Sequence, residues 1–176
     1  MYSICIDPGV GGTGYAIFRV PKIRKRAEGK STRMPIVATE LPRMPMKWYR
    51  QRKGDYQNKW MAKVDWYSWQ LRLAVSNHNL SAAYIEYPEL WGASAKSQAS
   101  AQQGDLMKLV FLCGCYAQTL TYAWSVQSTL IFPREWKGQM PKVVVAKRVY
   151  RAIERRYEST HITEAVGMGI ALQGRL

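Results

Sequence analysis

The chain has 176 residues, of which 47% are hydrophobic, so it suits one globular domain and is not a disordered tail. Its formal net charge is +14, from 26 Lys and Arg against 12 Asp and Glu, which favours a polyanionic partner such as nucleic acid or an anionic membrane. The longest apolar run is too short to cross a bilayer, and no signal-peptide pattern is visible, so we expect no membrane segment. Three cysteines in apolar surroundings predict buried free thiols in a reducing compartment.

The first 41 residues predict three strands. Residues 3–7 and 15–20 are apolar runs joined by P-G-V-G-G-T-G, whose glycines make a tight turn, so we expect them to pair as a hairpin. Residues 36–41 form the third candidate strand.

Most of the positive charge lies between residues 19 and 63, which hold 14 Lys and Arg but three acids. We expect a single domain over residues 1–176, with a basic insertion at about 21–63 that is largely mobile beyond its strand. Interleaved Trp48, Tyr49, Tyr56 and Trp60 favour a surface for phosphates and bases, the alternative being a solvated loop. The DNA contacts predicted here are Arg24, Lys25, Arg26, Lys47, Arg50, Arg52 and Lys53.

Hydrophobic periodicity predicts the remaining elements. They are a helix over 60–75, a strand over 82–86, a helix over 97–122, a strand over 125–127, a helix from 141 toward 157 and a last helix over 159–172. The 97–122 helix is apolar on more than one side, so it is either buried or paired with a second subunit. The order of strands and helices predicts an α/β architecture with a mixed sheet.

Four side chains could perform metal chemistry. Asp7 and Glu86 each end an apolar strand, and open α/β folds place their sites at strand carboxyl ends. His161 and Glu164 are three residues apart and share a face of the last helix, although a helix-capping role is the alternative. Carboxylates with one imidazole suit Mg²⁺ or Mn²⁺, and two such ions can hydrolyse a phosphodiester.

Three sequence blocks resemble RuvC-type Holliday junction resolvases, which are nucleases of the RNase H-like and retroviral-integrase superfamily. These blocks are I-C-I-D-P-G-V-G-G-T-G-Y-A, A-A-Y-I-E-Y-P and H-I-T-E-A-V-G-M-G, in the order and spacing of that family. The resemblance implies an RNase H-like fold with a central mixed five-stranded sheet, a homodimer, two Mg²⁺ ions per site and symmetric nicking of four-way DNA junctions. The basic insertion resembles the divergent phage or organellar branches. The resemblance therefore implies the cytoplasm of a bacterial or phage-infected cell, or an organellar matrix.

The resemblance also implies residue roles. Asp7, Glu86, His161 and Glu164 would form the metal-centred catalytic set. Lys137, in F-P-R-E-W-K-G, and Lys147, in V-A-K-R, resemble two family lysines that would contact phosphate. Family members insert an aromatic residue into the junction shortly after the second acid; the DNA-contact candidates in this neighbourhood are Tyr87, Trp91 and Lys96.

One position departs from the family pattern: Glu164 stands where the family nearly always has Asp. The longer side chain could displace a metal ion and lower the activity. The alternative function is therefore a protein that holds branched nucleic acid without cutting it; a less selective nuclease acting on flaps or forks is a further alternative.

Overall fold

The computed structural model describes residues 1–20, 34–89 and 104–174. Its five strands form one mixed sheet in the order β3-β2-β1-β4-β5. These strands are β1 (Tyr2–Asp7), β2 (Gly14–Arg19), β3 (Val37–Glu40), β4 (Leu80–Glu86) and β5 (Ser128–Ile131). β2 pairs antiparallel with both β1 and β3, whereas β1, β4 and β5 run parallel. The predicted hairpin and the mixed five-stranded sheet are confirmed.

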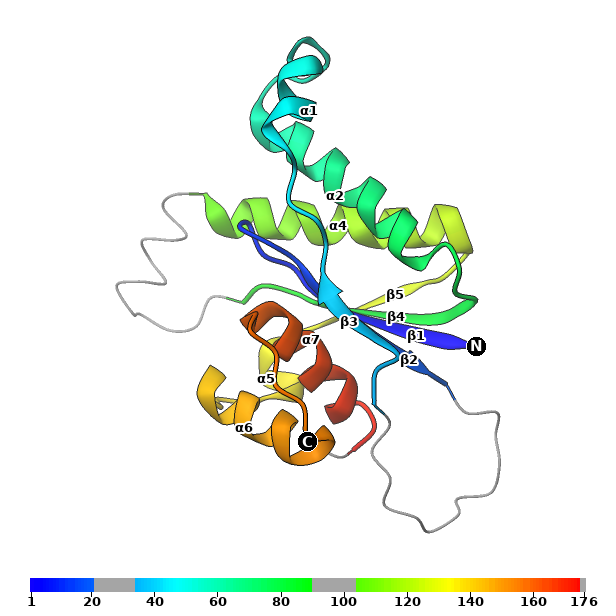
Figure 1. Ribbon diagram of the computed structural model, residues 1–176, viewed down its shortest axis with the longest axis vertical. Helices are drawn as coiled ribbons and strands as arrows, with labels where there is room; N and C mark the ends of the chain where they lie inside the picture. Colours follow the sequence, from blue (N-terminus) through cyan, green and yellow to red (C-terminus); the bar gives the residue numbers. More distant parts are fainter. Residues whose placement is uncertain (21–33, 90–103, 175–176) are drawn as a thin grey trace.

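Helices cover both faces of this sheet (Figure 1). One face carries α2 (Lys59–Val75) and α4 (Asp105–Trp124), and the other carries α5 (Pro133–Trp136), α6 (Lys142–Ile153) and α7 (Thr160–Ala171). The short helix α1 (Met46–Gln51) and a 3-10 turn (Lys53–Asp55) lie beyond the start of α2 (Figure 1). No helix in the described ranges is both long and apolar enough to cross a membrane.

The alternation of side chains along β1 explains the two layers. Ile4 and Ile6 pack into the cluster beneath α2 and α4, whereas Cys5 packs into the cluster beneath α5, α6 and α7. Because successive strand residues point to opposite faces, an uninterrupted apolar run is what a strand covered on both sides requires.

Small residues bring α7 against the sheet. A methyl group on Gly169 would lie 2.1 Å from the Phe18 ring, and one on Gly14 would lie 2.2 Å from the backbone of His161. The first turn of α7 therefore sits directly beside the start of β2, which places its polar side chains at one end of the sheet.

Two predicted boundaries were wrong, and a third lies partly outside the described residues. The fifth strand is Ser128–Ile131 rather than 125–127, because Ser125 takes a left-handed conformation (φ 56°) that ends α4. The helix after Pro141 stops at Ile153, since Glu154 is left-handed (φ 54°), and Tyr157 lies in the following loop. The long helix spans Asp105–Trp124 in the described chain; residues 97–103 of its predicted range lie outside the described residues.

The expectation of a mobile segment was wrong for residues 42–63, which contain α1, the 3-10 turn and the start of α2. Aromatic packing supports this arrangement. The Trp48 ring lies 5.2 Å from that of Trp66, whose indole N–H donates to the Pro42 carbonyl at 2.7 Å. Trp48 and Trp60 both pack against the core cluster, so these two rings support the fold.

Candidate metal centre and nucleic-acid interface

Two acids meet because two parallel strands end together. Asp7 is the last residue of β1 and Glu86 the last of β4, and Ile6 pairs with Ile85 in the parallel register. Both carboxylates therefore lie at the carboxyl edge of the sheet, as the strand-end pattern predicts.

The first turn of α7 adds His161 and Glu164 to this edge. Nδ1 of His161 lies 2.7 Å from Oδ2 of Asp7, across 154 positions of sequence. The glycine-rich turn makes room for the ring, since a Cβ on Gly9 would lie 2.5 Å from His161 Cε1. Ser159 caps the helix by accepting from the backbone N–H groups of His161 and Ile162.

Asp7, His161 and Glu164 could hold a metal ion. One ligand atom from each lies within 4.8 Å of the others, and the Asp7 and Glu164 side chains are 7% and 4% exposed. Two carboxylates with one imidazole form a donor set that fits Mg²⁺ or Mn²⁺. Glu86, the fourth predicted ligand, stands outside this group of three and joins it through a lysine.

Lys137 links the carboxylate of Glu86, at the end of β4, with that of Glu164, in α7. Its Nζ lies 2.6 Å from Oε1 of Glu164 and 3.2 Å from Oε1 of Glu86. Burial lowers the pKa of Lys137, but the charges and hydrogen bonds of both glutamates outweigh it and raise the pKa above its usual value. Lys137 is thus a partly buried ammonium group inside the acidic cluster, where a phosphate oxygen could replace a carboxylate contact.

Glu86 sits in a less hydrated environment than a surface carboxylate. Burial and the nearby Asp7 charge raise its pKa to about 7, against the opposing effect of Lys137. The indole N–H of Trp136 donates to its Oε2 at 2.8 Å. Trp136 is a contact that sequence reasoning missed, because no local pattern connects positions 86 and 136.

Glu164 behaves differently although it is also buried. Burial raises its pKa, but Lys137 and Lys142 together lower it below the usual value. Nζ of Lys142 lies 3.0 Å from its Oε2. Asp7, by contrast, has a raised pKa, mainly because of burial and despite its hydrogen bond to His161. The site therefore combines carboxylates with opposite tendencies to ionise.

Lys142, rather than Lys147, is the α6 lysine at this cluster. Lys147 is exposed and lines a separate cavity with Tyr150 and Tyr157. Lys142 has no motif of its own; its place as the first residue of α6, directly after Pro141, brings it to Glu164. The role implied for Lys147 remains a prediction.

The predicted DNA contacts divide into three groups. Lys47, Arg50, Arg52 and Lys53 are exposed on α1 and the turn after it. Tyr87 is half-buried and its ring lies edge-on to Phe132 at 5.6 Å, so it belongs to the edge of the core. Arg24, Lys25, Arg26, Trp91 and Lys96 lie outside the described residues.

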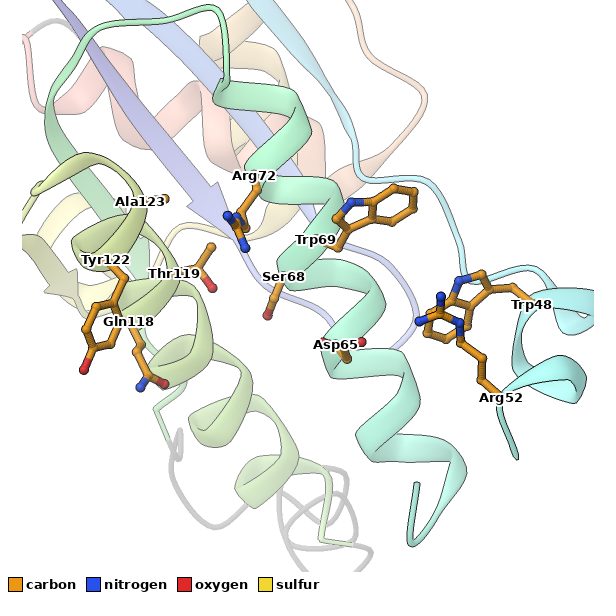
Figure 2. A pocket seen from close by; sticks show the side chains of 10 residues that line it. All are labelled: Trp48, Arg52, Asp65, Ser68, Trp69, Arg72, Gln118, Thr119, Tyr122 and Ala123. Atoms are coloured by element: carbon orange, nitrogen blue, oxygen red, sulfur yellow. The ribbon is translucent and has the colours of Figure 1, made fainter. Parts of the chain in front are cut away.

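The α1 region also borders a pocket of about 650 Å³ against α2 and α4. Figure 2 shows Trp48 and Arg52 on one side, Trp69 and Arg72 on α2, and Tyr122 on α4. The Arg52 guanidinium stacks on the Trp48 ring at 5.2 Å from its centroid. Trp69 and Tyr122 are 46% and 82% exposed, so this surface offers rings and cations together.

Comparison with known proteins identifies the architecture. No protein-family model matches the chain, and no curated protein matches it. The chain is similar to the Thermus thermophilus RuvC structure, with a TM-score of 0.69, 14% identity, and coverage of 99% of this chain and 98% of that one. It is also similar to T. thermophilus RuvC in complex with a Holliday junction substrate, with a TM-score of 0.66, 13% identity, and coverage of 97% and 91%. The chain therefore has the RuvC-type, RNase H-like fold.

Proposed function

We propose that this protein is a structure-selective DNA endonuclease that resolves four-way junctions by metal-dependent symmetric hydrolysis. The observation that carries the proposal is the cluster of Asp7, His161 and Glu164 at the carboxyl edge of a RuvC-type sheet, with Glu86 joined to it by Lys137. Burial raises the pKa values of Asp7 and Glu86, so gathering these carboxylates works against their ionisation. A cluster of this kind is typical of a functional site rather than of a structural one.

Each residue has a defined task in this proposal. Asp7, Glu86, His161 and Glu164 would hold two Mg²⁺ ions, with Mn²⁺ as an alternative. Such ions supply an activated water and stabilise the charge that develops on the cleaved phosphodiester. Asp7 orients the His161 ring through the Nδ1 contact, leaving Nε2 for a ligand or a proton.

Lys137 and Lys142 would position the phosphate. Both already bind carboxylate oxygens of Glu164, and a phosphate oxygen is an equivalent acceptor. The partly buried Lys137 would donate to an oxygen of the cleaved group, and the more exposed Lys142 would meet the strand at the mouth of the site.

The DNA would also contact the basic surface of α1. The described segment 43–63 carries seven Lys and Arg and one acid. Lys47, Arg50, Arg52 and Lys53 would follow the phosphate backbone of a junction arm, which makes affinity depend on salt.

A homodimer would match the two-fold symmetry of a four-way junction. Its support is an exposed stripe on α4, spaced three or four residues apart: Met107, Phe111, Gly114, Gln118 and Tyr122. A Cβ on Gly114 would meet no atom within 4 Å, so a second helix could approach closely there. The free thiols of Cys5, Cys113 and Cys115 support a reducing compartment, such as the cytoplasm of a bacterial or phage-infected cell.

A nicking assay on a synthetic four-way junction, in Mg²⁺ and separately in Mn²⁺, tests this function, with linear duplex as the substrate control. We expect paired nicks at symmetric positions in the junction and none in the duplex. Asp7→Asn and Glu164→Gln should each reduce cleavage at least a hundredfold while leaving junction binding intact. If purified Asp7→Asn still cleaved the junction, the assignment of the metal centre would be wrong.

The alternative function is a junction-binding protein that does not cut. It is favoured by the lysine contacts that already neutralise Glu86 and Glu164. Tight junction binding without nicks in either metal would establish this alternative.

A further inference from the structure

A cavity of about 310 Å³ lies between α6 and the loop that connects α6 to α7. The helix contributes Lys147 and Tyr150 on one face, and the loop contributes Arg155, Arg156 and Tyr157. The left-handed turn at Glu154 ends α6 and sends the loop back alongside that face.

Three cations line this cavity. In the part of the chain that the structure describes, no carboxylate lies within ion-pair distance of Lys147, Arg155 or Arg156. The two arginines instead stack on rings: Arg155 on Tyr157 at 5.3 Å and Arg156 on Tyr150 at 4.8 Å from the centroids. Stacking fixes the planes of the guanidinium groups while their N–H donors remain available.

The Tyr157 hydroxyl is the second observation that points to a ligand. It is buried, and it has no hydrogen-bond partner among the described residues. Burial also raises its pKa, so the phenol stays protonated and can donate. Because an unpaired buried hydroxyl is costly, a partner at this position would remove a penalty that the free protein carries.

The cavity adjoins the acidic cluster through consecutive residues. Val143 and Thr163 line the cavity, whereas Lys142 and Glu164, their direct neighbours in sequence, form the ion pair at the candidate metal centre. A strand whose phosphate reached Lys142 would therefore lie one residue away from the lining of this cavity.

We propose that this cavity binds a backbone phosphate of the DNA strand that is cut, at a nucleotide flanking the cleaved one. Lys147, Arg155 and Arg156 supply the charge, and the Tyr157 hydroxyl donates to a phosphate oxygen. This inference rests on the proposed nuclease function, and its tests separate the two. Glu154 and Glu158, which flank the arginines, lie outside the cavity lining and leave its charge positive.

The first experiment compares Tyr157→Phe with Tyr67→Phe. Tyr67 also has a buried hydroxyl without a partner in the described residues, but it belongs to α2, on the other face of the sheet. Neither variant loses a hydrogen bond to the described residues, so neither should have a Tm below that of the wild type. Junction affinity, measured with Ca²⁺ in place of Mg²⁺ to prevent cutting, should fall about three- to tenfold for Tyr157→Phe alone. Equal affinities for both variants would overturn the proposal.

The second experiment locates the phosphate. A neutral methylphosphonate is placed at single positions flanking the cut, and each junction is bound by wild type, Arg155→Gln and Arg156→Gln. At one position the neutral group should weaken junction binding by the wild type but hardly by the variants, because the arginine charge that faces this phosphate is already gone from them. Additive losses at every position would overturn the proposal, whereas a wild type that neither binds nor cuts junctions would refute the nuclease function itself.

Discussion

Nζ of Lys137 lies 2.6 Å from Oε1 of Glu164. Lys137 directly follows α5 and therefore neutralises an acid of α7 inside the candidate metal centre. The same ammonium group reaches Glu86 at 3.2 Å. In the protein without metal, this lysine therefore supplies the positive charge that two buried carboxylates need. Metal binding and the Lys137 contacts must then compete for the same oxygens.

Lys137→Met should make the fold depend on metal. Removing one partner of a buried ion pair costs about 3–5 kcal/mol, and a divalent ion would restore part of this loss by neutralising the carboxylates. Urea unfolding with and without Mg²⁺ measures the effect. Lys108→Met, which breaks the exposed pair with Asp105, should cost under about 1 kcal/mol without metal dependence. Equal Mg²⁺ responses in both variants would contradict this account.

Metal affinity should rise with pH up to neutrality. The pKa of Glu86 is about 7, chiefly because of burial, so below pH 7 its proton must leave before a metal can bind. The metal affinity should therefore increase from pH 5.5 to 7, by up to about tenfold per pH unit, and then level off. Calorimetric titration with Mn²⁺ measures it. Glu86→Gln should show weaker binding with a shallower rise near pH 7; the part that remains belongs to His161, whose pKa is raised by its hydrogen bond to Asp7. An unchanged profile in that variant would show that Glu86 does not release the proton.

Trp136→Phe should weaken the site through Glu86. The substitution keeps a ring but removes the N–H that donates to Oε2, so the charged form of Glu86 loses support and its pKa rises further. We expect Mn²⁺ affinity at pH 7 to fall several-fold and to recover at pH 8.5, where Glu86 is ionised regardless. Trp69→Phe, at an exposed ring on α2, is the control and should leave affinity unchanged. A loss that persists at pH 8.5 would indicate a packing defect instead.

Phe111→Glu should produce a monomer. Phe111 is 45% exposed in the middle of the α4 stripe, and a charge buried between two copies would have no partner. Light scattering coupled to size exclusion measures the mass of the wild type and the variant. Leu172→Glu, at an equally exposed residue directly after α7, should leave the assembly intact. A dimeric Phe111→Glu protein would place the interface elsewhere.

Local chemistry in the sequence was enough to predict the strand-end acids. An apolar run that stops at Asp7 and another that stops at Glu86 can be recognised without coordinates, because a buried strand must end where it meets charge. The same holds for the shared face of His161 and Glu164, which depends on helix geometry alone. The RuvC-type fold was implied by the resemblance of three sequence blocks to that family, and the structural similarity to Thermus thermophilus RuvC confirms it.

Only the tertiary structure decided which cations and rings join the acids. Trp48 and Trp60 look like nucleic-acid contacts in a basic segment, yet they pack on the core, because ring burial depends on which helix folds over them. Lys142 rather than Lys147 reaches Glu164, and Trp136 reaches Glu86 across 50 positions. Such choices are set by the pairing of β1 with β4 and the docking of α7 on β2, long-range contacts that no local pattern of charge or hydrophobicity encodes.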